Sequence, residues 1–159
     1  MANYGTDTCF RLDWPEAACR TLQEAVECVA HRLPVDDLPV ETRRVVLRLL
    51  DDYDTLGADI WSSAHHGEGV VVRDDDGMFA PHGMADLISA VMRDHRLSRP
   101  VSFTWAETCD KHRVGAFSGG GAVVSAEHVR LLRIEDWLEA ARADLAAAEE
   151  TAPSPAPAP

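Results

Sequence analysis

The sequence lacks any hydrophobic run approaching the ~18–20 consecutive apolar residues that a membrane-spanning helix requires. Its first residues, MANYGTDTCFRLDW, lack the basic start and apolar stretch of a secretory signal. Basic residues are also scarce, with 15 Lys+Arg against 27 Asp+Glu and a formal net charge of −12. This excess of negative charge argues against general nucleic-acid binding and against docking on anionic lipid. We therefore expect a soluble, cytoplasmic protein with no membrane association.

Cysteine is sparse, and no two cysteines have the Cys-x-x-Cys spacing of a zinc or redox motif. Cytoplasmic cysteines are generally reduced. Cys19 and Cys28 fall in a helical pattern among apolar neighbours, so we predict that they are buried and structural. The glycine patterns of the P-loop and of dinucleotide-binding folds are also missing, and no cofactor is expected.

What the sequence does contain is enough apolar surface for a core, at 46% of 159 residues, and a length typical of one domain. Hydrophobic periodicity predicts helices over 13–32, 40–54, 82–96 and 134–150. Alternating or β-branched runs predict short strands at 60–61, 70–72, 101–106 and 122–125. The expected fold is α+β: a single domain over 1–150, with a small antiparallel sheet packed on one face by about four helices. The Pro/Ala-rich tail, 151–159, is expected to be disordered, and a mostly helical protein with one hairpin is the alternative.

Several local features carry finer predictions. Residues 1–12 hold few apolar positions and are expected to be irregular or an edge element. Asp13 and Glu16 have the spacing of a helix-capping box. Ser125 is expected to cap a short helical turn that runs through Leu132. Apolar packing in the core is predicted for the last helix and for three tryptophans: Trp14, Trp61 and Trp137.

The segment over 101–128 combines two strand patterns with a chemically diverse connection between them. In one hypothesis Cys109 is a nucleophile and His112 its base, oriented by Glu107 or by the adjacent Asp110. Neighbouring cations would favour the thiolate form. Against this hypothesis, catalytic partners are usually distant in sequence. The corresponding function would be a small transferase or hydrolase.

A second hypothesis for this segment is a zinc site. Cysteine and histidine are the ligand types that zinc prefers, and structural sites need four of them. Only the Cys-x-x-His half has familiar spacing. The candidate ligands are Cys109, His112, His65 and His66.

A third hypothesis concerns the glycine triplet, which consists of Gly119, Gly120 and Gly121. Backbone N–H groups can form an anion-binding nest where φ is positive, and Lys111 with Arg113 would add positive charge. The favoured alternative is structural. In it the glycines let the chain turn tightly into the second strand beneath Trp105 or Phe117.

The same segment resembles a family of small proteins encoded in bacterial genomes, plasmids and phages. The matching positions are Phe103, Trp105, Ala106, Cys109, Lys111, Arg113, Phe117 and the glycines at 119–121. The resemblance covers roughly the last third of the chain, and the chain departs from the pattern at His112 and Ser118. The family has no established activity, so the resemblance implies the extent of the element and no particular chemistry.

Taken together, these patterns favour a small acidic interaction or accessory protein, with a mobile-element or defence-related role following from the resemblance. Its expected partner is another protein, and an acidic mimic that fills a partner's nucleic-acid groove is one form of this. The contact surface is predicted over 107–121, with binding residues Lys111, Arg113, Phe117, Gly119, Gly120 and Gly121. A Cys109/His112 enzyme and a zinc-binding module are the alternatives, and the sequence leaves the oligomeric state open.

Overall fold

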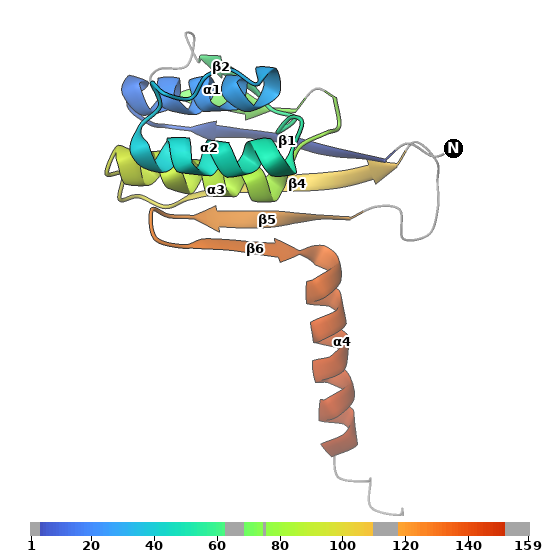
Figure 1. The fold of residues 1–159 in the computed structure, drawn as a ribbon. Helices are drawn as coiled ribbons and strands as arrows, with labels where there is room; N and C mark the ends of the chain where they lie inside the picture. The colour runs from blue at the N-terminus through green and yellow to red at the C-terminus, as the bar shows by residue number, and fades with distance from the viewer. Residues whose placement is uncertain (1–3, 63–68, 75, 110–117, 152–159) are drawn as a thin grey trace, which may run out of the picture.

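The computed structural model describes residues 4–62, 69–74, 76–109 and 118–151. This part of the chain forms six strands and four helices (Figure 1). Their order is β1 (Tyr4–Leu12), α1 (Glu16–His31), α2 (Val40–Asp52), β2 (Asp59–Ser62), β3 (Val70–Arg73), α3 (Pro81–Asp94), β4 (Val101–Cys109), β5 (Ser118–Val124), β6 (Val129–Arg133) and α4 (Ile134–Thr151). None of these helices is both long enough and apolar enough to cross a bilayer. The tail at 152–159 lies outside the described residues, so its disorder stays a prediction.

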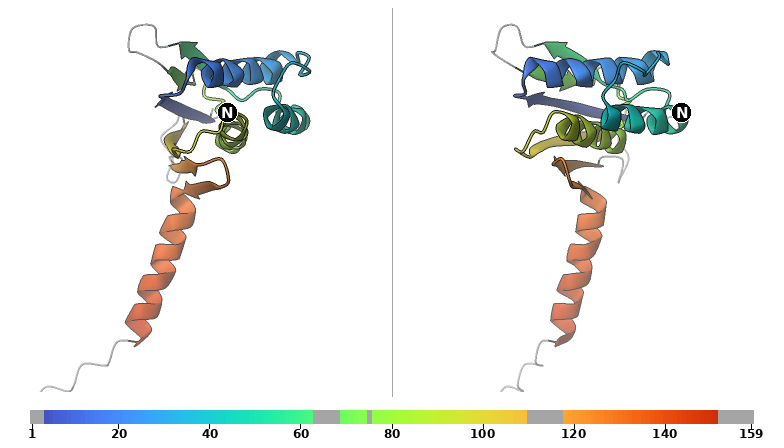
Figure 2. Two further views of the ribbon diagram at one scale, coloured as in Figure 1. Left: turned by 90° about the vertical axis from the view of Figure 1, so that its left-hand side faces the viewer. Right: turned by 60° about the vertical axis from the view of Figure 1, so that its left-hand side comes forward.

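All six strands belong to one antiparallel sheet with the order β2-β3-β1-β4-β5-β6. Helices α1, α2 and α3 lie together on one face of this sheet, and the described chain leaves the other face uncovered (Figure 2). The α+β class and the expected four helices are confirmed. The sheet is larger than the small sheet that the sequence predicted.

Strand β1 accounts for much of this difference. It pairs with β3 on one side and β4 on the other, so it is a central strand. The expectation of an irregular or edge element over 1–12 is therefore wrong. Its inward positions include Thr8, which is 7% exposed and donates its hydroxyl hydrogen bond to the Thr104 carbonyl at 2.7 Å. Because its hydroxyl is hydrogen-bonded, this threonine can occupy a buried position, although the sequence pattern counts it as a polar residue.

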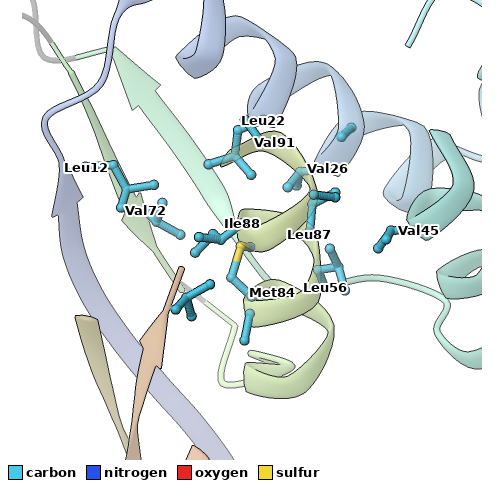
Figure 3. Packing of buried hydrophobic residues seen from close by; sticks show 14 of the residues in the cluster. Leu12, Leu22, Val26, Val45, Leu56, Val72, Met84, Leu87, Ile88 and Val91 are labelled. Atoms are coloured by element: carbon cyan, nitrogen blue, oxygen red, sulfur yellow. The ribbon is translucent and has the colours of Figure 1, made fainter. Parts of the chain in front are cut away.

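The core lies between the sheet and α3, the helix that packs against both α1 and α2. Met84, Leu87, Ile88 and Val91 are completely buried along this helix and point at the sheet and at the other two helices (Figure 3). The apolar stripe predicted for this helix is confirmed. On the sheet side, three phenylalanines pack on one another, with the stacked rings of Phe10 and Phe103 at a centroid distance of 4.7 Å.

The first helix begins differently from the prediction. Pro15 is the N-cap residue of α1, and no side chain caps the helix. The capping box of Asp13 and Glu16 does not form. Instead the Asp13 carboxylate pairs with Arg11 Nε at 2.6 Å.

Helix α2 is capped by a residue distant in sequence. Asp94, at the end of α3, accepts hydrogen bonds from the backbone N–H groups of Glu41 at 3.1 Å and Thr42 at 2.8 Å. It also accepts one from the Thr42 hydroxyl at 2.7 Å. These bonds satisfy donors that a helix start leaves unpaired, and they tie α2 to α3.

The segment after β5 is a hairpin, so the helical turn predicted from Ser125 to Leu132 is wrong. The Ser125 N–H donates to the His128 carbonyl at 2.8 Å, and the His128 N–H donates to Ser125 Oγ at 3.0 Å. The Ser89 hydroxyl of α3 donates to the Ser125 carbonyl at 2.8 Å. Contact with α3 holds the turn, and the chain returns along β5 as strand β6.

The tryptophan predictions hold in one case of three. Trp14 is buried, whereas Trp61 is 59% exposed and Trp137 is 55% exposed. Trp137 and Leu138 belong to α4, which extends away from the sheet and from the other three helices (Figure 1). The prediction that this helix packs its apolar residues into the core is therefore wrong.

Candidate functional site

Several of the residues that the sequence singled out lie outside the described chain. They are His65, His66, Lys111, His112, Arg113 and Phe117. Cys109 is the last residue of β4 and pairs with Tyr4 in the sheet. Among the described residues, no three His, Cys, Asp or Glu side chains gather where they could hold a metal ion. The Cys109/His112 enzyme and the zinc site thus stay predictions.

Glu107 is held in an ion pair across the sheet. Nη2 of Arg133, on β6, donates to both carboxylate oxygens of Glu107, at 3.2 and 3.1 Å. Both side chains are partly exposed, at 31% for Glu107 and 48% for Arg133. A pair of this kind stabilises a fold by about 0.2–1 kcal/mol. Its evident role is to link β4 and β6 beyond the intervening strand β5.

The three glycines lie inside strand β5 and do not form a loop. Gly119, Gly120 and Gly121 pair with Ala106, Trp105 and Thr104 in turn. None of the three has a positive φ, although Gly57, Gly69 and Gly77 do. An anion-binding nest needs the positive-φ conformation, so the glycines do not form one here.

Packing explains two of the glycines. A Cβ on Gly120 would lie 2.2 Å from Cζ2 of Trp105 and 2.4 Å from the Leu132 carbonyl oxygen. A Cβ on Gly119 would lie 2.5 Å from the Trp105 carbonyl oxygen. The indole of Trp105 therefore occupies the space above Gly120. This agrees with the structural hypothesis to the extent that a glycine lies beneath Trp105, but the triplet is strand and makes no tight turn.

Gly121 has a different environment, because alternate residues of a strand face opposite sides of the sheet. A Cβ there would meet nothing closer than the Phe103 carbonyl oxygen at 3.6 Å and Cγ2 of Thr104 at 3.7 Å, which are ordinary contacts. Gly121 faces the side of the sheet without helices. That uncovered face is the most distinctive surface of the described chain.

Small side chains form the centre of the uncovered face. The strand register sets Thr104 beside Gly121 and Ala106 beside Gly119. Val123 on β5 and Leu132 on β6 lie beside this centre and are 54% and 53% exposed. Trp61, 59% exposed, lies on β2 at the opposite edge of the sheet, beyond β1 and β3. This surface was not among the predicted sites, although the alternation that predicted a half-buried β4 also implies an outward face of Ser, Thr and Ala.

The charges on the uncovered face contrast with the acidity of the whole chain. Strand alternation and register assign to it three arginines and two aspartates, in a chain with a net charge of −12. They are Arg11, Arg73, Arg130, Asp7 and Asp59. The charges on this face thus nearly balance, whereas the chain as a whole is strongly acidic.

The thiols of three described cysteines divide into one exposed and two buried groups. Cys9 is exposed and faces the uncovered side of the sheet, whereas Cys19 and Cys28 are buried, as predicted. Burial raises the pKa of both buried thiols, and nearby glutamates act on the pKa of Cys28 in the same direction. Each thiol donates to a backbone carbonyl at 3.4 Å. These two thiols are structural, because a protonated, buried thiol is a poor nucleophile.

An arginine-lined hollow of about 460 Å³ lies between the end of β1 and the connection from α3 to β4. Arg11 lines it and is already paired with Asp13 at 2.6 Å. The other two arginines, Arg96 and Arg99, are exposed. The hollow is open, and no buried charged group points into it. It therefore lacks the enclosed, converging polar groups that mark a small-molecule site.

No protein-family model, no curated protein and no solved structure matches this chain. The resemblance of the segment around 103–121 to a bacterial family therefore stays a prediction. The uncovered face and α4 are the features of the described chain that bear on function.

Proposed function

We propose that this protein acts by binding another protein, with the uncovered face of the sheet as its contact surface. One observation carries the proposal: Val123 and Leu132, two exposed large apolar side chains, lie beside a centre of small residues on a face that none of the described helices covers. Exposed Trp61 lies on the same face at the opposite edge of the sheet. Large exposed apolar areas rimmed by polar groups are typical of interaction sites. A surface of small residues also lets a partner's backbone or bulky side chains approach closely.

The segment over 107–121 belongs to the same proposal. It joins β4 to β5, the two strands that carry Thr104, Ala106, Gly119 and Gly121 on the uncovered face. Of the predicted contact residues, Gly119 and Gly121 lie on this face, while Lys111, Arg113 and Phe117 lie outside the described residues, so their part in the contact stays a prediction. An accessory role in a mobile element or in defence is the biological setting that the family resemblance suggests.

Binding without chemistry is favoured over catalysis by the groups that the structure describes. Cys19 and Cys28 are buried, and Glu107 is paired with Arg133. The hollow with the arginines lacks a buried nucleophile or base among its lining residues. An enzyme needs a concave site where such groups converge.

The test is capture of partners from an extract of the source cell, followed by quantitative mass spectrometry. Val123→Glu and Leu132→Glu add a charge to the contact surface and should reduce the retained partner at least tenfold, which corresponds to about 1.4 kcal/mol. Leu47→Glu is the matched control, because Leu47 is a 51% exposed apolar residue on α2, in the helical layer. Thermal melts confirm that all three variants fold. Equal retention by wild type and both sheet variants would refute the proposal.

A further inference from the structure

Helix α4 starts where the sheet ends. Strand β6 is an edge strand, and α4 follows its last residue, Arg133, with no residue between them. Figure 2 shows α4 continuing beyond the β6 edge and leaning away from the side on which α1, α2 and α3 lie. The helix thus points into the space that a further strand or a second molecule beside β6 would occupy.

The apolar stripe of α4 has no counterpart in the described body of its own chain. Ile134, Trp137 and Leu138 are 46%, 55% and 40% exposed, and Ala141 continues the same stripe one turn later. Most helices in proteins owe their stability to packing of an amphipathic face rather than to helix propensity alone. An 18-residue helix with an exposed tryptophan therefore needs a surface to pack against.

The uncovered face of the sheet has the properties that this stripe requires. Its centre consists of small residues, which leaves room for the bulky side chains of a helix, and Val123 and Leu132 add apolar area beside β6. Its charged residues are three arginines and two aspartates, whereas α4 carries six acidic residues and one arginine. The small centre and the adjoining apolar side chains therefore suit the bulky apolar stripe of α4, and the face does not share the strong negative charge of the helix.

Length also fits. At 1.5 Å per residue, the 18 residues of α4 extend about 27 Å, and neighbouring strands lie about 4.8 Å apart. The helix is therefore long enough to cross about five strands of a sheet. It starts at the edge of its own sheet and leads away from it, so the face within its reach is that of a neighbouring molecule.

We propose that two copies of this chain meet along β6 and exchange their α4 helices, each helix covering the uncovered sheet face of the other copy. Helix and face occur in the same chain, so a two-fold axis next to β6 forms both contacts at once, as closed symmetric dimers require. The pairing also covers the free edge of β6, which would otherwise remain open to uncontrolled strand addition. This inference rests on the proposed contact surface and names its occupant as a second copy.

Oligomeric state is the first measurement. Sedimentation equilibrium or light scattering of the full chain at micromolar concentrations should give about twice the 17.4 kDa chain mass. Trp137→Glu should raise the dimer dissociation constant at least tenfold. Ala143→Glu, on the opposite side of α4, should leave that constant unchanged. Monomeric wild type at every concentration, or a dimer indifferent to Trp137→Glu, would overturn the inference. Neither result would affect the proposed function, which depends on partner capture by Val123 and Leu132.

Cross-linking tests the position of the helix. Ala141 lies seven residues into α4, about 10 Å along it, which is two strand spacings and thus over β5 of the second copy. With Cys9 and Cys109 changed to serine, one tagged chain carries Ala141→Cys and a second carries Val123→Cys. Mild oxidation of the mixture should yield the disulfide-linked heterodimer, and Ala143→Cys in place of Ala141→Cys should not. Equal yields from the two helix positions would show that α4 does not lie on the sheet of its partner.

Discussion

The contrast between Gly120 and Gly121 gives a direct test of the sheet geometry. The two residues are adjacent in β5 but face opposite sides of the sheet. A methyl group added at Gly120 enters the space of Trp105, while the same group at Gly121 enters the uncovered face. Alanine at each position is therefore a matched pair that differs only in which side of the strand receives the Cβ.

The expected magnitudes follow from the distances. At Gly120 the new Cβ would be 2.2 Å from Cζ2 of Trp105 and 2.4 Å from a carbonyl oxygen of β6, so a buried ring and a paired strand must both shift. Overpacking of this kind costs about 1–3 kcal/mol. At Gly121 the nearest atoms lie at 3.6 and 3.7 Å. Loss of glycine's extra unfolded-state entropy then stabilises the alanine variant by up to about 0.5–1 kcal/mol.

The assay is urea denaturation followed by tryptophan fluorescence and circular dichroism. Gly120→Ala should unfold at lower urea than Gly121→Ala, with a difference in unfolding free energy of about 1–4 kcal/mol between them. Combining Gly120→Ala with Trp105→Leu should recover part of the loss, because the smaller side chain removes the clash. Equal stability of the two alanine variants would refute the packing of Trp105 over Gly120. So would a double variant whose loss of unfolding free energy equals the sum of the losses of its two single variants.

Two further predictions concern the helices. Asp94→Ala should lower the unfolding free energy by about 1–3 kcal/mol, since it removes the cap of α2; amide hydrogen exchange at Glu41 and Thr42 should accelerate, and unchanged exchange would contradict the assigned cap. Because the pKa values of the Cys19 and Cys28 thiols are raised in the folded protein, these thiols lose their protons at a lower pH in the unfolded chain. Their contribution to stability is therefore present below the ordinary thiol pKa of about 8.5 and declines above it. Unfolding free energies measured at pH 7 and pH 9.5 test this expectation. The control variant Cys9→Ser should lose the same stability between these two pH values as the wild type. If a thiol reagent labels Cys19 and Cys28 in the folded protein as fast as Cys9, the expectation is contradicted.

Most of the helical part of the fold could be predicted because its signals are local. The stripe of α3, including Leu87 and Ile88, repeats with the helical period, and all of it is buried. The burial of Cys19 and Cys28 followed from the same periodicity in α1. The exposed tryptophans show the limit of prediction from periodicity, since an apolar stripe identifies a helix face that favours burial without identifying the surface that buries it.

The strands show why local pattern was insufficient for the sheet. Thr8 occupies an inward position of β1 because its hydroxyl donates a hydrogen bond to the carbonyl of Thr104 on β4, 96 residues away. A glycine is needed at position 120 of β5 because the Trp105 ring occupies the space that a side chain there would fill. Both facts depend on pairing between distant segments, and neither leaves a mark in the neighbouring residues.

The candidate site shows the same division. Glu107 was predicted from the sequence as a candidate orienter of a Cys109/His112 site, whereas in the structure it pairs with Arg133, from a strand whose first residues the sequence predicted to be a helical turn. The sequence by itself determined the α+β class, the four helices and the buried stripes, because periodicity and composition act within one element. The order of the strands, the uncovered face and the exposure of α4 were decided only by the tertiary structure, since sheet pairing and burial are set by which distant segments meet.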